Sequence, residues 1–179
     1  MQLLVSSFAI TLLPIARVTD PCTDLVTMYS RMGAANSYTQ TKIAPGGPTV
    51  KTEFVAPDRL RTDNDGHQSI SIGNKSWTNL GGHWYGGSGS HAFESEIQIW
   101  KAAADNGTLL QSCRSADVVD LGLVNGLHVY HMNAPKFGVQ NVIYLQADSL
   151  PVRIETTTRG KTYITTYEWN APITINAPE

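Results

Sequence analysis

Five histidines are the residues of this chain best able to bind a metal ion or transfer a proton. His83 and His91 lie in and after a glycine-rich stretch that Glu94 follows, and this flexible spacing leaves a zinc site or an acid–base pair open. His128 and His131 are three residues apart on a predicted strand, which places them on opposite faces. His83, His91 and Glu94 therefore form the candidate hydrolytic site, with surface histidines in a loop as the alternative.

The serines of the glycine-rich stretch do not fit a catalytic motif. Residues 86–90 read Gly-Gly-Ser-Gly-Ser, and the Gly-x-Ser-x-Gly of a nucleophile elbow fails because Ser90 occupies the last position. The stretch does not continue into Lys-Ser or Lys-Thr, so it is not a phosphate-binding loop. We therefore expect no catalytic residue, no cofactor and no enzyme activity.

The two cysteines, Cys22 and Cys113, predict one structural disulfide. A small, even number of cysteines in an exported chain is typical of such a bond, and both residues lie in or beside predicted helices that could dock together. Two buried free thiols are the alternative.

Methionine and aromatic side chains suggest an adaptable apolar surface. Met28 and Met32 lie on one predicted helix and Trp100 on another, and such side chains accept ligands of varied shape. Strand alternation predicts that apolar residues of the sheet share the face below these helices. The predicted cavity lining consists of Met28, Met32, Phe54, Ile70, Ile72, Trp77 and Trp100. A filled core would explain the same residues.

Helix signals flank a region rich in strands. Asp20 and Pro21 are a good N-cap and first helical residue, and Gly33 lies near the helix end. A second helix is predicted from Glu94 to Ala104, followed by a helical turn at 109–113. The stretch 80–90 between the first strands and this helix, with five glycines, predicts a mobile loop.

Alternating apolar residues and turn signals predict the strands. They cover 37–44, 50–56, 59–62, 68–72, 75–79, 118–123, 127–133 and 139–146, then a hairpin around Arg159 and Gly160 and an edge strand at 173–175. This order predicts an α+β fold in which helices cover an incomplete antiparallel β-barrel, formed by a strongly curved sheet. We expect residues 20–179 to form one domain.

Composition and the N-terminus bear on partners and location. The 179 residues carry 13 basic and 15 acidic side chains, a net charge of −2, so nucleic acid is not an expected partner. Residues 3–15 are mostly apolar but shorter than the roughly 20 residues that span a bilayer. Residues 1–19 are interpreted as a signal peptide or an N-terminal apolar segment, and the former predicts a periplasmic or secreted protein.

Three motifs carry a resemblance to a known family. They are Asn36-Ser-Tyr-Thr-Gln-Thr-Lys42, Phe54-Val-Ala-Pro-Asp-Arg-Leu-Arg61 and Ser71-Ile-Gly-Asn-Lys-Ser-Trp77. Together they resemble the LolA/LolB-like periplasmic lipoprotein carriers. The closing segments 150–155 and 167–178 are similar to the ending of mycobacterial lipid-transfer lipoproteins, so the resemblance covers residues 22–178. One departure is Ala56, which stands where the carriers have a basic residue before the motif proline.

The resemblance implies an incomplete barrel closed by helices, with an apolar cavity for lipid or lipoprotein acyl chains. It predicts an exported carrier or sensor with a lid at 22–35 and 94–104, and a membrane-bound donor or acceptor protein as a further partner. Because of Ala56, the lid mechanism of the carriers does not transfer. Two alternatives stay open: a secreted hydrolase that uses His83, His91 and Glu94, and an envelope module that docks a protein partner on the same fold.

Overall fold

A computed structural model describes residues 20–88, 94–105 and 107–179 of the chain. The N-terminal apolar segment, the end of the glycine-rich stretch and His91 lie outside these residues. None of the helices within the described ranges is long and apolar enough to cross a membrane.

Helix α1 (Pro21–Gly33) begins and ends where the sequence predicts. The Asp20 carboxylate accepts a hydrogen bond from the Cys22 backbone N–H at 3.2 Å, which satisfies one of the free donors at the helix start. Its buried face contains Leu25, Met28 and Met32 at helical spacing. At the other end, a Cβ on Gly33 would lie 2.8 Å from Lys101 Cγ, so this glycine permits the close approach of the second helix.

Helices α2 (Glu94–Asp105) and α3 (Thr108–Arg114) complete the helical layer. Both pack against α1. A disulfide joins Cys22 of α1 to Cys113 of α3, which confirms the predicted bond. The Arg114 guanidinium also lies 3.6 Å from the Asp20 carboxylate. The three helices are therefore tied to one another as well as to the sheet.

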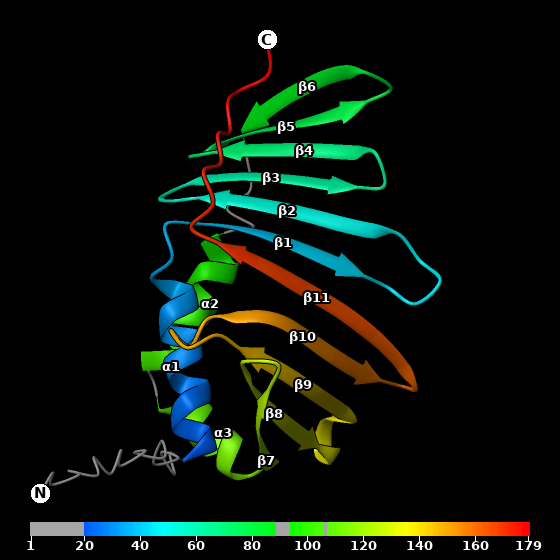
Figure 1. Cartoon of the computed structure of the whole chain (residues 1–179). Coiled ribbons are helices and arrows are strands. Elements are labelled where there is room, and N and C mark those ends of the chain that lie inside the picture. Colours follow the sequence, from blue (N-terminus) through cyan, green and yellow to red (C-terminus); the bar gives the residue numbers. More distant parts are fainter. Residues whose placement is uncertain (1–19, 89–93, 106) are drawn as a thin grey trace, which may run out of the picture.

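Eleven antiparallel strands form one sheet in the order β6-β5-β4-β3-β2-β1-β11-β10-β9-β8-β7. Their bounds are β1 Ser37–Ile43, β2 Thr49–Val55, β3 Arg59–Asn64, β4 His67–Ile72, β5 Lys75–Leu80, β6 His83–Ser88, β7 Asp117–Val124, β8 Leu127–Ala134, β9 Val139–Leu145, β10 Pro151–Thr158 and β11 Lys161–Trp169. The first and last strands pair, so two meanders join into one curved sheet beside the helices (Figure 1). The sheet is not closed, and the predicted α+β class is confirmed.

The glycine-rich stretch is not a mobile loop over residues 83–88. Gly81 and Gly82 have φ values of +62° and +88° and turn the chain into strand β6, which pairs with β5. Trp77 lies opposite Gly86, where a Cβ would lie 2.7 Å from its indole ring. The prediction was wrong here because a glycine opposite a large ring permits close cross-strand packing. Residues 89–93 lie outside the described part of the chain.

Residues 171–179 do not form the predicted edge strand. The segment leaves β11 and runs past the ends of β2 to β5, in red in Figure 1. Ser37 Oγ donates to the Ala171 carbonyl at 2.8 Å and Arg59 Nη1 to the Ile175 carbonyl at 2.7 Å. These side chains bind backbone carbonyls that would otherwise accept hydrogen bonds from a neighbouring strand. Pro172 has no backbone N–H to donate, so the segment does not pair as an edge strand. Ile175 is nevertheless only 1% exposed.

Candidate functional site beneath the helices

Three neighbouring strands place aromatic rings on the face that the helices cover. Tyr38 of β1 lies directly opposite Phe54 of β2 and Trp169 of β11, so the three side chains share this face. The ring centroids of Tyr38 are 5.3 Å from Phe54 and 5.5 Å from Trp169. Trp100 of α2 reaches the same place from the helical side, with its centroid 5.4 Å from that of Tyr38.

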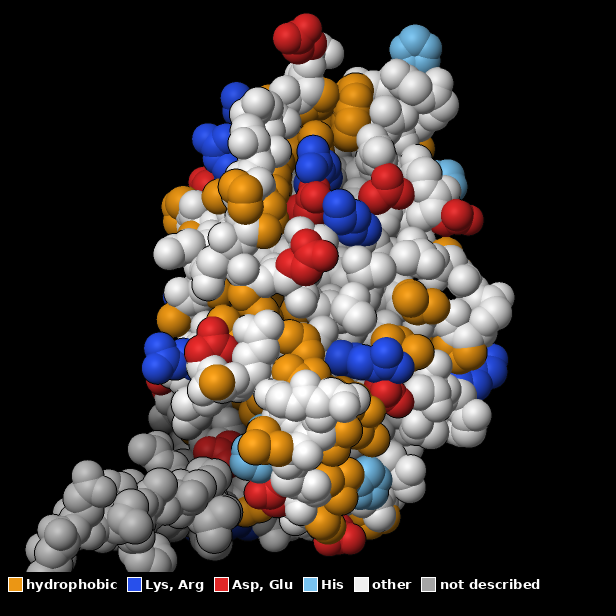
Figure 2. Space-filling view, in the orientation of Figure 1, with side chains coloured by type: hydrophobic (Ala, Val, Ile, Leu, Met, Phe, Trp, Pro, Cys, Tyr) orange, Lys and Arg blue, Asp and Glu red, His pale blue; other side chains and the backbone are white. Residues whose placement is uncertain are grey.

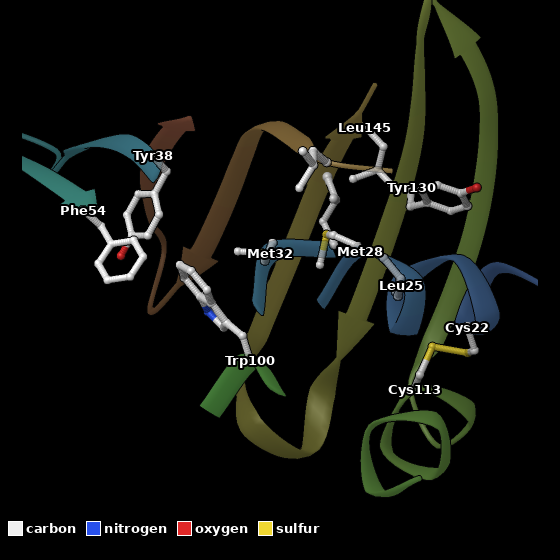
Figure 3. Packing of buried hydrophobic residues seen from close by; sticks show 12 residues of the cluster. Cys22, Leu25, Met28, Met32, Tyr38, Phe54, Trp100, Cys113, Tyr130 and Leu145 are labelled. Carbon is white, nitrogen blue, oxygen red and sulfur yellow. A yellow bond between two sulfur atoms is a disulfide. The ribbon is translucent and has the colours of Figure 1, made fainter. Parts of the chain in front are cut away.

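Helix α1 and the other half of the sheet extend this apolar layer. The helix-covered cluster consists of Cys22, Leu25, Met28, Met32, Tyr38, Phe54, Trp100, Cys113, Tyr130, Ile143, Leu145 and Leu150. In Figure 3 the Trp100 side chain lies between the Tyr38–Phe54 pair and Met32, and the disulfide lies at the far end of the row. Each member is at most 6% exposed, so the cluster is a packed apolar layer between the helices and the sheet.

The predicted cavity lining is split between the two faces of the sheet. Phe54 pairs with Leu60, and Leu60 pairs with Ser71. Ile70 and Ile72 flank Ser71 and therefore point to the opposite face.

Trp77 pairs with Ile70 and lies on that opposite face as well. Met28, Met32, Phe54 and Trp100 thus meet beneath the helices, whereas Ile70, Ile72 and Trp77 do not. The expectation that all the sheet residues share one face was wrong, since the pairing register decides the face of each strand.

The opposite face has its own buried groups. Ile70 is 7% exposed and Glu53 8% exposed, and the C-terminal segment binds Ser37 and Arg59 on this face. Burial by itself would raise the pKa of Glu53. Lys51 Nζ lies 2.9 Å from Glu53 Oε1, and Arg61 binds the other carboxylate oxygen. The hydrogen bonds and positive charges of these two residues outweigh the effect of burial and hold the pKa of Glu53 below its usual value. Glu53 is thus a paired structural carboxylate.

Polar atoms at the margin of the helix-covered cluster are engaged in structural contacts. Tyr130 Oη donates to the Asp24 carboxylate of α1 at 2.7 Å, and Trp169 Nε1 donates to the Pro151 carbonyl at 2.6 Å. Burial raises the pKa of the Tyr29 hydroxyl, which packs against the cluster from α1. The site is therefore apolar at its centre, and the polar groups at its margin are held in structural hydrogen bonds.

The histidines do not assemble a metal centre within the described residues. His128 pairs with Leu145 and His131 with Val142, so they lie on opposite faces, as predicted. His128 Nε2 instead lies 2.8 Å from the Asp120 carboxylate. His83 is exposed on β6, while His91 and the side chain of Glu94 lie outside the described part of the structure. The hydrolase alternative therefore gains no support from geometry.

Sequence reasoning missed Tyr38, Trp169 and Tyr130 as members of this site. Tyr38 lies near the start of β1, and the later residues on its face, Gln40 and Lys42, are polar. The alternation of apolar and polar residues therefore gives little indication that this face is buried. Trp169 follows Tyr167 at the strand spacing of two residues, and their rings stack at 5.2 Å. That spacing could have placed both on the helix-covered face.

A second group of apolar side chains lies away from the cluster, on edge strand β7. Val119, Leu121, Leu123 and Val124 are between 43% and 75% exposed. Figure 2 shows hydrophobic side chains gathered over β7 to β9 at the lower end of the view. These residues are separate from the aromatic layer beneath the helices.

Comparisons with known proteins find similar structures and no match by sequence. No family model matches the chain, and no curated protein matches it by sequence. The crystal structure of the lipoprotein LppX of Mycobacterium tuberculosis covers 87% of this chain and 98% of its own, with 13% identity and a TM-score of 0.58. LprF from Mycobacterium bovis covers 88% and 96%, with 12% identity and a TM-score of 0.62.

A third similar structure comes from the complex of MucA and MucB of Pseudomonas aeruginosa. It covers 87% of this chain and 59% of the matched chain, with 13% identity and a TM-score of 0.52. Likeness at such low identity establishes the fold. The chain therefore has the curved-sheet fold of the mycobacterial proteins LppX and LprF, as the resemblance in its sequence predicts.

Proposed function

We propose that this protein is an exported, non-enzymatic carrier or sensor that binds a lipid or lipoprotein acyl chain between its helices and its sheet. The fold that it shares with a lipoprotein supports the general class and an envelope location. The observation that carries the proposal is the helix-covered cluster, in which Trp100 of α2 packs on Tyr38 of β1 and the flexible methionines of α1 continue the apolar layer.

The composition of this cluster suits an exchangeable apolar ligand. Met28 and Met32 have unbranched side chains that adapt to gaps of irregular shape, and Trp100 offers a broad apolar face. An acyl chain that displaced these side chains from the sheet would gain about 0.8 kcal/mol per buried CH₂ group. Such a site favours long chains and discriminates little between head groups.

The connections among the helices support movement as one lid. The disulfide and the contact of Gly33 with Lys101 join α1 to α3 and α2, whereas the helices meet the sheet largely through apolar side chains. In the proposed cycle the helices separate from the sheet, the acyl chain enters, and the side chains close over it. Residues 1–19 direct export, and a membrane-bound protein donates or accepts the ligand.

A cavity-creating substitution tests this site. Phe54→Ala removes a large ring beneath the helices and should lower the free energy of unfolding by about 3–5 kcal/mol. A long-chain fatty acid that fills the void should restore part of this loss, since a ligand at 100 times its dissociation constant stabilises by about 2.7 kcal/mol. Thermal unfolding of delipidated protein with and without palmitate measures both effects.

Ile70→Ala is the matched control, because Ile70 is also buried, at 7% exposed against 2% for Phe54, but lies on the other face. It should lower stability without any rescue by palmitate. Equal palmitate stabilisation of the two variants, or none in either variant and in the wild type, would refute acyl-chain binding at this site. Recovery of a bound protein in place of lipid from the periplasm would favour the docking module instead.

A further inference from the structure

An open pocket lies where the connection between β8 and β9 meets the turn between β10 and β11. That connection contains the short helix η1 (Pro135–Phe137). The pocket is lined mainly by Asn133, Gly138, Gln140, Thr157, Arg159 and Gly160. It lies at the end of the sheet away from α1, towards the lower right of Figure 1.

Adjacent strands supply hydrogen-bonding side chains to this pocket in one row. Asn133 of β8 pairs with Gln140 of β9, and Thr157 of β10 pairs with that same Gln140. Ala134 follows Asn133 in the chain, Val139 precedes Gln140, and these two residues pair on the helix-covered face. Since successive side chains of a strand alternate between faces, Asn133 and Gln140 lie on the opposite face. Two amides and a hydroxyl can thus donate to the same group from one side.

The charge around the pocket is positive, although the whole chain has a net charge of −2. The two segments that form it, residues 133–140 and 156–162, contain Lys136, Arg159 and Lys161 and no acidic residue, while Asp117 of β7, which pairs with Asn133, is the one acidic side chain beside that row in the described strands. The preceding acid on β10, Glu155, accepts hydrogen bonds from Arg153 at 2.9 Å and Tyr144 at 3.1 Å. The pocket therefore has the charge and the donors to bind an anion.

A large apolar side chain stands beside this positive charge. Phe137 ends helix η1 and is 72% exposed, although phenylalanine is usually buried. Basic residues that flank an exposed aromatic residue are typical of surfaces that rest on anionic membranes, where the ring enters the interface and the cations meet phosphates. A free anion would leave the exposure of Phe137 unexplained.

We infer that this end of the sheet binds the anionic headgroup of a phospholipid and docks the protein on a membrane surface. Arg159 contacts the phosphate with its planar guanidinium, the row of Asn133, Gln140 and Thr157 donates to headgroup oxygens, and Phe137 enters the interface. The inference rests on the proposed function, since a lipid carrier must reach a membrane to take up or release its ligand.

Vesicle co-sedimentation of the full chain tests the inference. The wild type should bind vesicles of phosphatidylglycerol and phosphatidylcholine more tightly than vesicles of phosphatidylcholine alone, and high salt should weaken this binding. Arg159→Gln should lower the partition coefficient about fivefold, as expected for the loss of one basic residue near an anionic surface. Phe137→Ser should weaken binding at every salt concentration.

Lys75→Gln is the matched control, because it removes the same charge from exposed Lys75 at the start of β5, several strands away. It should leave the partition coefficient unchanged. An equal loss in Lys75→Gln and Arg159→Gln would indicate non-specific attraction and overturn the inference. Saturable binding of inorganic phosphate without vesicle binding would overturn it as well, because the pocket would then serve a free anion.

The two proposals can fail separately. Phe54→Ala should sediment with vesicles as the wild type does, and Arg159→Gln should keep the stabilisation by palmitate. Melting temperatures of Arg159→Gln and Phe137→Ser equal to that of the wild type show that these variants fold. Loss of vesicle binding in Phe54→Ala but not in Arg159→Gln would move the membrane contact to the helix-covered site and contradict docking through the pocket.

Discussion

Glu53 is a carboxylate that the fold keeps charged although it is only 8% exposed. Burial alone would raise its pKa, but Lys51 and Arg61 lower it below the usual value. A group with a lowered pKa in the folded state stabilises the protein above its unfolded pKa, near 4.3, and loses this contribution as the pH falls through the folded pKa. Stability should therefore decline below about pH 5.

Glu53→Gln isolates this effect. At pH 7 the substitution should cost about 1–3 kcal/mol, because Arg61 and Lys51 lose a charged acceptor. Below the folded pKa of Glu53 the variant and the wild type should converge. Urea denaturation between pH 3 and pH 7 measures the difference, with Glu168→Gln as the exposed control. A difference that does not change with pH would show that Glu53 is not held ionised by these partners.

The C-terminal segment acts as an element of the fold without secondary structure. Ile175 is 1% exposed and its carbonyl accepts from Arg59. Ile175→Ala should therefore lower the free energy of unfolding by about 2–5 kcal/mol, as for a core residue. Thr174→Ala, at the exposed neighbouring position, should change it by no more than about 0.5 kcal/mol. Similar values for the two variants would show that the segment is not part of the core.

Local signals explain which elements the sequence predicts well. The N-cap at Asp20 and the turn at Arg159 and Gly160, with φ values of +50° and +72°, need information from a few residues only. The strand β6 was missed for the opposite reason. Its glycines become a strand only because Trp77 of β5 covers Gly86, and no local pattern shows that contact.

Face assignment depends on turns and on distant segments. The two-residue turn at Asp65 and Gly66 pairs Asn64 with His67, and this register sends Ile70 away from Phe54. Apolar residues on that second face look like cavity lining if only the helices are expected to cover the sheet. Ile70 is instead buried on this second face, and Ile72 and Trp77 are half-buried there. The C-terminal segment binds on the same face through Arg59 and Ile175, which are 116 residues apart in the chain. The candidate site could therefore be predicted on its helical side and, in the sheet, only at Phe54.

At the scale of the whole molecule, one sheet carries a helical layer on one face and an extended segment on the other. The two coverings are held differently. The extended segment is anchored to strands by side-chain hydrogen bonds, whereas α1 and α3 are joined covalently to each other. In the proposed function the helical layer moves as a unit, and this difference in attachment would leave the pairing of β1 with β11 in place.

Removal of the disulfide tests this independence. Cys22 and Cys113 are 91 residues apart, and the chain-entropy model gives an upper value of roughly 4–5 kcal/mol for a loop of this length. Cys22→Ala with Cys113→Ala should lower stability by up to that amount in urea, and a reducing agent should bring the wild type to the same value. Hydrogen exchange should accelerate in α1 and α3 while β1 and β11 keep their protection. Equal acceleration in the helices and in the central strands would show that the disulfide stabilises the whole domain, and that the helices do not form a separable lid.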